Sequence, residues 1–278
     1  MSVIKKNARP LAIEPYDKEW GVGVSGLTDE VSPFPRINRI LNWLKERDTT
    51  ADAQRALIYT EGNKKYAMYP QNIKCAMILR DVLQQVDIHI WPDELIVGEL
   101  AAPPKSAPVY PEFSMEWLCD ELINHPMDQR TNDRYVISDK VKEQLLSIRE
   151  DWKGQTVSEA VLASYSEQEL AGSHLGKGVI FDGLYVYAGV GHVCADYATL
   201  FQQGFGGIRK RVEQALAACD TTKPEDVKRR EFYQAELIML EGACSYIHRY
   251  GVLAGQMAQE EADPTRKAEL ERISSNCL

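Results

Sequence analysis

The chain has 278 residues, of which 44% are hydrophobic and 26% charged, proportions typical of a globular protein. Its formal net charge of −9 at pH 7 argues against a nucleic-acid-binding protein, because phosphate binding needs a basic face. The first twenty residues lack the apolar core of a signal peptide, and no window approaches the roughly 18 apolar residues of a membrane span. The six cysteines include no CxxC pair, so neither a zinc site nor a disulfide framework is indicated. A cytoplasmic protein that binds no membrane and no metal is expected.

The N-terminal half begins irregularly and then becomes helical. Residues 1–34 are rich in proline, glycine and charge and are expected to form an irregular arm. Apolar side chains then follow the i, i+3, i+4, i+7 pattern of an amphipathic helix from Ile37 to Leu44. Residues 50–67 and 70–85 predict two more helices, the second of which opens with a proline.

Residues 86–98 have a different pattern. Val86, Ile88 and Ile90 alternate with polar residues, and a Pro-Asp pair separates them from a second apolar run. This pattern predicts two short strands around a turn. The acidic residues there, Asp93, Glu94 and Glu99, are interpreted as solvated turn residues, and the proline-rich residues 101–112 as an extended loop.

The rest of the chain is predicted to be nearly all helix. Ser138 is a helix N-cap, and Asp263 followed by a proline is a strong start signal for the last helix. The other predicted helices cover residues 113–124, 139–152, 156–166, 195–220 with a glycine interruption, and 224–261. The expected fold is therefore mainly α with a few short strands.

The segment GLYVYAGVGHVCADY, residues 183–197, is the strongest candidate for a functional site. Its glycines allow the backbone to approach another body closely, and His192 at their end can donate a hydrogen bond to a hydroxyl or protonate it. A ligand, an acid–base catalyst and a hydrogen-bonded core histidine all remain open. Asp196 is either part of this site or the cap of the next helix. Cys194 is interpreted as a small buried side chain, because no activating charge other than His192 is near.

Common catalytic signatures do not appear. The sequence has no phosphate-binding glycine loop, no nucleophile elbow and no HExxH motif.

Several segments together resemble a known family. They are RALIYTEGNKKY, PDELIVGEL, VYPEFSMEWLCDEL, YVYAGVGHVCADYATLFQQGFGGI and YGVLAGQMAQEEADPTRKAELERIS. In this order they are similar to the N-terminal region of glycyl radical enzymes of the pyruvate formate-lyase-like group, and most of all to the B12-independent glycerol and 1,2-propanediol dehydratases. The resemblance departs at Lys74-Cys75, where relatives usually carry two arginines.

This resemblance implies a fold and a division of the chain. Residues 51–278 would be the N-terminal helical part of an incomplete ten-stranded β/α barrel, and residues 1–50 an N-terminal extension or arm. In some relatives such extensions target the enzyme to bacterial microcompartments. The family's loops with the catalytic cysteine and the radical glycine have no counterpart in this chain, so a fragment or one half of a split enzyme, inactive alone, is expected.

The resemblance also implies partners. The family carries no separate cofactor in this region and uses a protein glycyl radical that a radical S-adenosylmethionine activating enzyme installs. The expected partners are a small-molecule diol, a C-terminal half or full-length homologue, and that activating enzyme. Because the helices of the family pack on barrel strands, the isolated chain is expected to self-associate through the segment VDIHIW and the apolar side of the helix around Ile238, Met239, Leu240 and Tyr246.

By resemblance, His192 would contact the hydroxyl groups of the diol and help one of them to leave as water, with Tyr187 and Asp196 also binding the substrate. Choline-cleaving relatives carry a carboxylate at the position of His192. Isethionate-cleaving relatives carry a glutamine there and an arginine where this chain has Ala188. These lyases, and a non-catalytic helical protein that binds a partner, remain the alternatives.

Overall fold

The computed structural model describes residues 33–173 and 193–278. Within these ranges it contains eleven α-helices, one short 3-10 helix and two strands of three residues each. The prediction of a mainly α fold with a few short strands is thus confirmed. No helix in the described ranges is long and apolar enough to cross a membrane.

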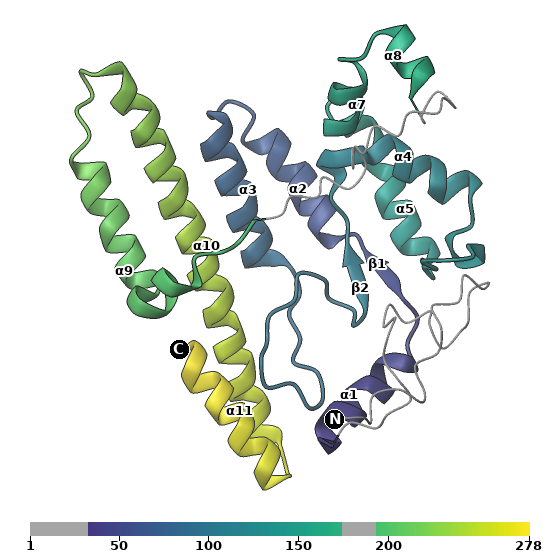
Figure 1. Cartoon of the computed structure of the whole chain (residues 1–278). Helices are drawn as coiled ribbons and strands as arrows, with labels where there is room; N and C mark the ends of the chain where they lie inside the picture. Colours follow the sequence, from purple (N-terminus) through teal and green to yellow (C-terminus); the bar gives the residue numbers. More distant parts are fainter. Residues whose placement is uncertain (1–32, 174–192) are drawn as a thin grey trace, which may run out of the picture.

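The longest helix, α10 (Pro224–Glu260), organises one half of the structure. It packs against α3 (Gln71–Gln85), α9 (Tyr197–Ala217) and α11 (Pro264–Cys277), which lie side by side with it in Figure 1. Small residues on α10 allow this close packing. A Cβ atom added at Gly242 would lie 2.9 Å from Cα of Arg80 on α3, so only glycine fits there without a shift of the backbone.

The other half is built on α2 (Gln54–Lys65), which packs against α3 on one side and near α4 (Pro111–Asn124) and α5 (Asp139–Ser147) on the other. Its core includes Trp152 of α6 (Arg149–Trp152), whose indole N–H donates to Oγ1 of Thr60 at 2.8 Å. Two short helices follow, α7 (Val157–Leu162) and α8 (Glu167–Gly172), and each begins with a capping box. A 3-10 turn, η1 (Met127–Gln129), precedes α5.

The two strands lie where the sequence predicted none. β1 (Thr50–Asp52) pairs in parallel with β2 (Ser106–Pro108), in the register Thr50–Ser106 and Asp52–Pro108. β1 occupies the expected start of a helix, and β2 lies in the proline-rich segment interpreted as a loop. The buried carboxylate of Asp52 stabilises this junction, because it accepts hydrogen bonds from the N–H groups of Gln54 at 3.0 Å and Ala102 at 2.9 Å.

The two strands predicted in residues 86–98 do not form. The segment forms turns and irregular structure there, and Ile88, Ile90 and Val97 pack against α10 and α11. Every second side chain faces α10 and α11, and this packing explains the alternation without strand pairing. The expectation of an uncovered VDIHIW segment is also wrong for Ile90, which is only 6% exposed.

Most helix ends agree with the sequence. α1 (Pro35–Lys45) lies in the predicted amphipathic segment, Ser138 caps α5, and Asp263 caps α11 through the N–H groups of Thr265 and Arg266. The predicted glycine interruption of α9 is a kink at Gly204, whose φ is +62°. The helix predicted over residues 139–152 is divided at Ile148, where the backbone leaves helical geometry.

Candidate functional site

The candidate site of the sequence is described only from residue 193 onward. His192 and Tyr187 lie outside the described residues, so their positions relative to Asp196 are not part of the structure. Asp196 is the N-cap of α9. Its Oδ1 accepts a hydrogen bond from the N–H of Thr199 at 3.0 Å, and its Oδ2 accepts one from the Thr199 hydroxyl at 2.6 Å. These bonds lower the pKa of the Asp196 carboxyl, so the cap is ionised at neutral pH.

Thus the capping role is the one that the structure shows for Asp196, and contact with a substrate stays a prediction. A well-capped helix start fixes the direction in which the chain enters α9. Because His192 precedes the cap by four positions in the sequence, Asp196 anchors the C-terminal side of the candidate histidine segment.

Beside the cap, α9 presents apolar side chains to the outside. Tyr197 is 61% exposed and Phe201 is 84% exposed, and their rings stack with centroids 6.2 Å apart. Val193 is 90% exposed. Cys194 is exposed as well, so the prediction of a buried cysteine is wrong. Contiguous exposed apolar patches are often contact surfaces for protein or ligand, so this group is a candidate for one.

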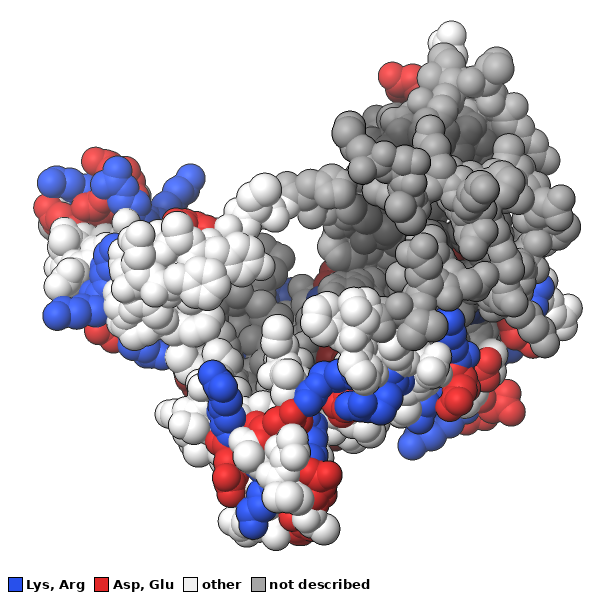
Figure 2. All heavy atoms as spheres, turned by 60° about the horizontal axis from the view of Figure 1, so that its bottom comes forward, with Lys and Arg blue, Asp and Glu red and all other residues white. Residues whose placement is uncertain are grey.

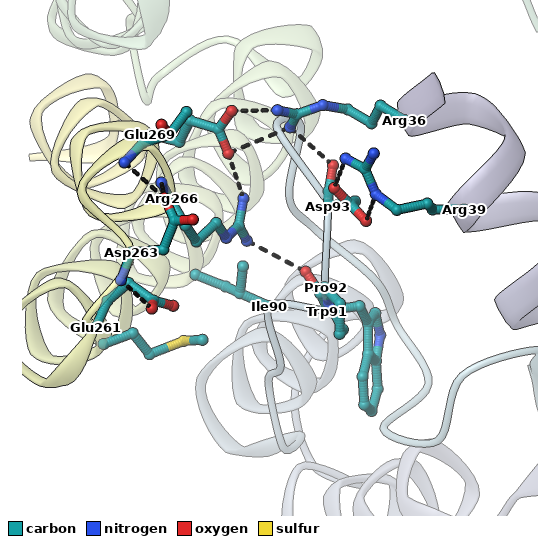
Figure 3. A pocket seen from close by; sticks show the side chains of 12 residues that line it. Arg36, Arg39, Ile90, Trp91, Pro92, Asp93, Glu261, Asp263, Arg266 and Glu269 are labelled. Carbon is teal, nitrogen blue, oxygen red and sulfur yellow. Dashed lines mark hydrogen bonds and ion pairs between the residues drawn. The ribbon is translucent and has the colours of Figure 1, made fainter. Parts of the chain in front are cut away.

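A second feature is a pocket of about 400 Å³ between α1, the loop at residues 90–93 and α11. Figure 3 shows Arg36 and Arg39 reaching into it from α1, while Arg266 and Glu269 enter from α11. Glu269 forms ion pairs with both Arg36 and Arg266, the latter at 3.1 Å. Asp93 binds Arg39 through two hydrogen bonds of 2.8 and 2.5 Å.

The charges of this pocket compensate one another. The Arg36 guanidinium lowers the pKa of Glu269, and the Arg39 guanidinium lowers that of Asp93, so both acids are carboxylates at neutral pH. Arg266 also donates to the backbone oxygens of Glu94 at 2.7 Å and Trp91 at 3.2 Å. All three arginines among the described lining residues are thus paired with carboxylates of neighbouring elements, so the pocket connects α1, the loop and α11.

The acidic residues of the loop are therefore not the solvated residues that the sequence suggested. Glu94 is half-buried, and its Oε2 accepts a hydrogen bond from the N–H of Trp91 at 2.7 Å. Burial raises the pKa of Glu94, and the neighbouring Glu99 raises it further. Glu99 in turn accepts a hydrogen bond from the indole N–H of Trp91 at 3.2 Å. The sequence did not predict these hydrogen bonds. Glu94 and Glu99 meet Trp91 only because the loop folds back on itself, and Asp93 meets Arg39 only because α1 lies beside the loop.

Sequence reasoning also missed the arginines of the pocket. Arg36 and Arg39 are three positions apart on a predicted helix, which places them on one face, and that spacing is the signal that was available. Their partner Glu269 is 233 residues away from Arg36, and only the fold brings the two together.

Within residues 33–173 and 193–278, no group of His, Cys, Asp and Glu side chains is arranged to hold a metal ion. On the face shown in Figure 2, basic and acidic side chains of the described part are interspersed, which is not the basic surface that nucleic acid needs.

Comparison with known proteins identifies the class. A model of the family described as pyruvate formate lyase-like matches residues 28–278, so the chain belongs to this family. The predicted relationship and the predicted fold, the N-terminal helical part of the glycyl radical enzyme barrel, are both confirmed.

Individual relatives narrow the comparison. The chain is 34% identical over 265 residues to (2S)-3-sulfopropanediol dehydratase of Klebsiella oxytoca, covering 95% of this chain and 32% of that protein. The glycerol-bound B12-independent glycerol dehydratase of Clostridium butyricum has a TM-score of 0.83 at 33% identity, covering 89% of this chain and 31% of the other. A structure of 1,2-propanediol dehydration in Roseburia inulinivorans also gives 0.83, at 30% identity, covering 89% and 30%. The chain spans about a third of the length of the curated relatives it matches.

Proposed function

We propose that residues 51–278 are the N-terminal part of a glycyl radical diol dehydratase, which eliminates water from glycerol, 1,2-propanediol or a similar vicinal diol. The observation that carries this proposal is the combination of the GVGH segment with the 0.83 TM-score to a dehydratase structure that holds glycerol. Residues 1–50 would be an extension of this part.

In this proposal the chain's own residues bind and orient the diol. His192 donates a hydrogen bond to a hydroxyl group and delivers the proton with which that group leaves as water. Tyr187 supplies a second polar contact, and the glycines before His192 keep the space for the substrate open. The radical chemistry, abstraction of a hydrogen atom from the diol, comes from the remainder of the family fold after its activation by a partner enzyme.

Holding the diol in one orientation is a large part of the catalytic effect. Positioning a reactant beside its acid converts a step between free molecules into one within a complex, which lowers the entropic part of the barrier. Asp196 contributes indirectly, since its cap fixes the chain that leads away from His192.

A sulfonated diol is the second candidate, because the Klebsiella relative is named for such a substrate and is 34% identical to this chain. The sequence favours a diol without a sulfonate group. The position at which isethionate-cleaving relatives carry a sulfonate-binding arginine is Ala188 here, which offers no positive charge.

The test is a chimera in which this chain replaces the matching third of the Clostridium butyricum glycerol dehydratase. The chimera is activated anaerobically and its glycyl radical is quantified by EPR before glycerol, 1,2-propanediol and sulfopropanediol are supplied. We expect a glycyl radical and dehydration of glycerol, 1,2-propanediol or both. A radical without turnover of any diol contradicts the proposal and favours a non-catalytic or differently specific protein. Turnover of sulfopropanediol alone selects the second candidate.

A further inference from the structure

The first helix of the described chain is attached to the body in an unusual way. No residue of α1 is buried, although its sequence is strongly amphipathic. Phe34, just before it, is 63% exposed and Ile37 is 44% exposed. Ile40, Leu41 and Leu44 are only partly covered. An isolated helix of eleven residues is marginal in water, so α1 depends on contacts with the body to stay helical.

Among the described residues, these contacts include ion pairs and hydrogen bonds of two arginines on α1. Arg36 donates to Oε2 of Glu269 at 3.2 Å and to the backbone oxygen of Asp93 at 3.1 Å. Arg39 forms a bidentate ion pair with the Asp93 carboxylate, and the Arg39 side chain remains 56% exposed. Figure 3 shows these interactions running from α1 across the pocket to the loop and to α11.

The loop is shaped to meet α1. Asp93 has a φ of +66°, a left-handed conformation that aspartate and asparagine adopt more readily than most residues. Next to it, the rings of Trp43 and Trp91 approach within 5.5 Å. Beyond the helix, the Lys105 ammonium donates to the backbone oxygen of Arg47 at 2.6 Å, which fastens the C-terminal end.

We propose that α1 is a releasable strap, held on the body by these ion pairs, and that it forms one wall of the pocket only while it is docked. The Arg39 side chain is 56% exposed, so salt screens its ion pair with Asp93, whereas the Arg36–Glu269 pair, with side chains 29% and 19% exposed, is screened less. Salt does not weaken the burial of apolar surface. Salt should therefore release α1 and leave the rest of the fold intact. Release would uncover Trp91, Asp93 and Glu269, which contact α1 in the docked state.

Hydrogen exchange measured by mass spectrometry on the 278-residue chain tests the strap. Exchange is followed in peptides covering residues 35–45 and, as an internal reference, residues 224–260 of α10. Between 50 mM and 1 M KCl we expect exchange in the α1 peptide to rise by about fivefold or more, since the Debye length falls from over 10 Å to about 3 Å. The α10 peptides should not change.

The variants Asp93→Asn and Glu269→Gln, singly and together, remove the negative charges and keep the size of the side chain and one acceptor oxygen. The double variant should exchange rapidly in the α1 peptide at both salt concentrations. Asp133→Asn is the matched control, because Asp133 also has a positive φ, of +50°, and its side chain is exposed. It should behave as the unmodified chain does. Exchange in α1 that is independent of salt, or slower at high salt, would overturn the proposal, since the partly covered apolar residues would then hold the helix.

Discussion

The backbone N–H of Glu99 donates a hydrogen bond to the hydroxyl of Tyr250 at 3.1 Å, which ties the loop after α3 to a helix 151 residues later in the chain. Tyr246, one turn earlier on α10, donates to the backbone oxygen of the same residue. The two tyrosines hold the loop so that Glu94 and Glu99 point inward while Asp93 points toward α1. The position of this loop therefore affects both stability and the docking of α1.

The inward-pointing Glu94 predicts a pH dependence. Because burial raises its folded-state pKa above that of the unfolded chain, its contribution to stability is fully present at low pH and is lost as pH rises through the folded pKa. Glu94→Gln keeps an acceptor for the Trp91 N–H and carries no charge. We expect this variant to be more stable than the unmodified chain at pH 7 and equal to it below about pH 4.

Urea denaturation at a series of pH values measures this difference directly. Glu143→Gln is the control, because Glu143 is exposed on α5. Its stability should follow that of the unmodified chain at every pH. A constant difference between Glu94→Gln and the unmodified chain from pH 4 to pH 7 would show that Glu94 does not titrate differently in the two states.

Substitution of glycine by alanine should have opposite effects on stability at Gly242 and Gly206. Gly242→Ala places a methyl group 2.9 Å from the Arg80 backbone and should destabilise the fold by about 1–3 kcal/mol. Gly206→Ala meets nothing within 4 Å in α9 and should stabilise it by about 0.5–1 kcal/mol through helix propensity. Thermal and urea unfolding check both. Equal effects would mean that α3 and α10 are not packed as closely as described.

Two ion pairs of α4 differ in burial and so should differ in strength. Arg55 is buried, lies 3.8 Å from the ring centre of Tyr110, and pairs with Glu112 at 2.6 Å. Glu112→Gln leaves this guanidinium without its counter-charge and should cost about 2–4 kcal/mol. Glu116 pairs with Arg149 at the surface, so Glu116→Gln should cost less than about 1 kcal/mol.

Unfolding in urea distinguishes the two carboxylates, which lie four positions apart on one helix. Similar losses would contradict the burial of Arg55, and a large loss only for Glu116→Gln would reverse the assignment.

The exposed aromatic pair of α9 predicts self-association of the isolated chain. Of the α10 residues expected to be uncovered, Met239 is 39% exposed, whereas Ile238 and Tyr246 are partly buried and Leu240 is only 8% exposed. Phe201→Ser should therefore reduce ANS fluorescence and shift the sedimentation profile toward the monomer. Cys244→Ser, an exposed substitution on α10, should leave both unchanged. A monomer with no ANS signal before any substitution would remove the basis for this expectation.

Helix boundaries could be predicted well from the sequence because their causes are local. A proline at the first turn, a serine or aspartate that accepts from the second or third N–H, and a glycine with positive φ act within four residues. Ser138, Pro224, Gly204 and Asp263 are such signals, and each marks the end or kink that the structure contains.

The strands and the pocket could not be predicted because their partners are distant. β1 pairs with residues 56 positions later, and Arg36 pairs with Glu269, so neither has a local pattern. Residues 86–90 do alternate, but the strand interpretation failed because Ile88 and Ile90 pack against helices and have no partner strand among the described residues. The candidate histidine was found only through a motif, and its geometry stays a prediction.

The most direct test of the central claim, that this chain supplies the group that binds and protonates the diol, is the turnover of His192→Ala in the activated chimera. EPR quantifies the glycyl radical in both proteins, and His192→Gln serves as a variant that retains a hydrogen-bond donor. We expect an unchanged radical content and a loss in kcat of about a hundredfold or more for His192→Ala, the effect of removing a positioned acid. Full turnover by His192→Ala at equal radical content would contradict the account.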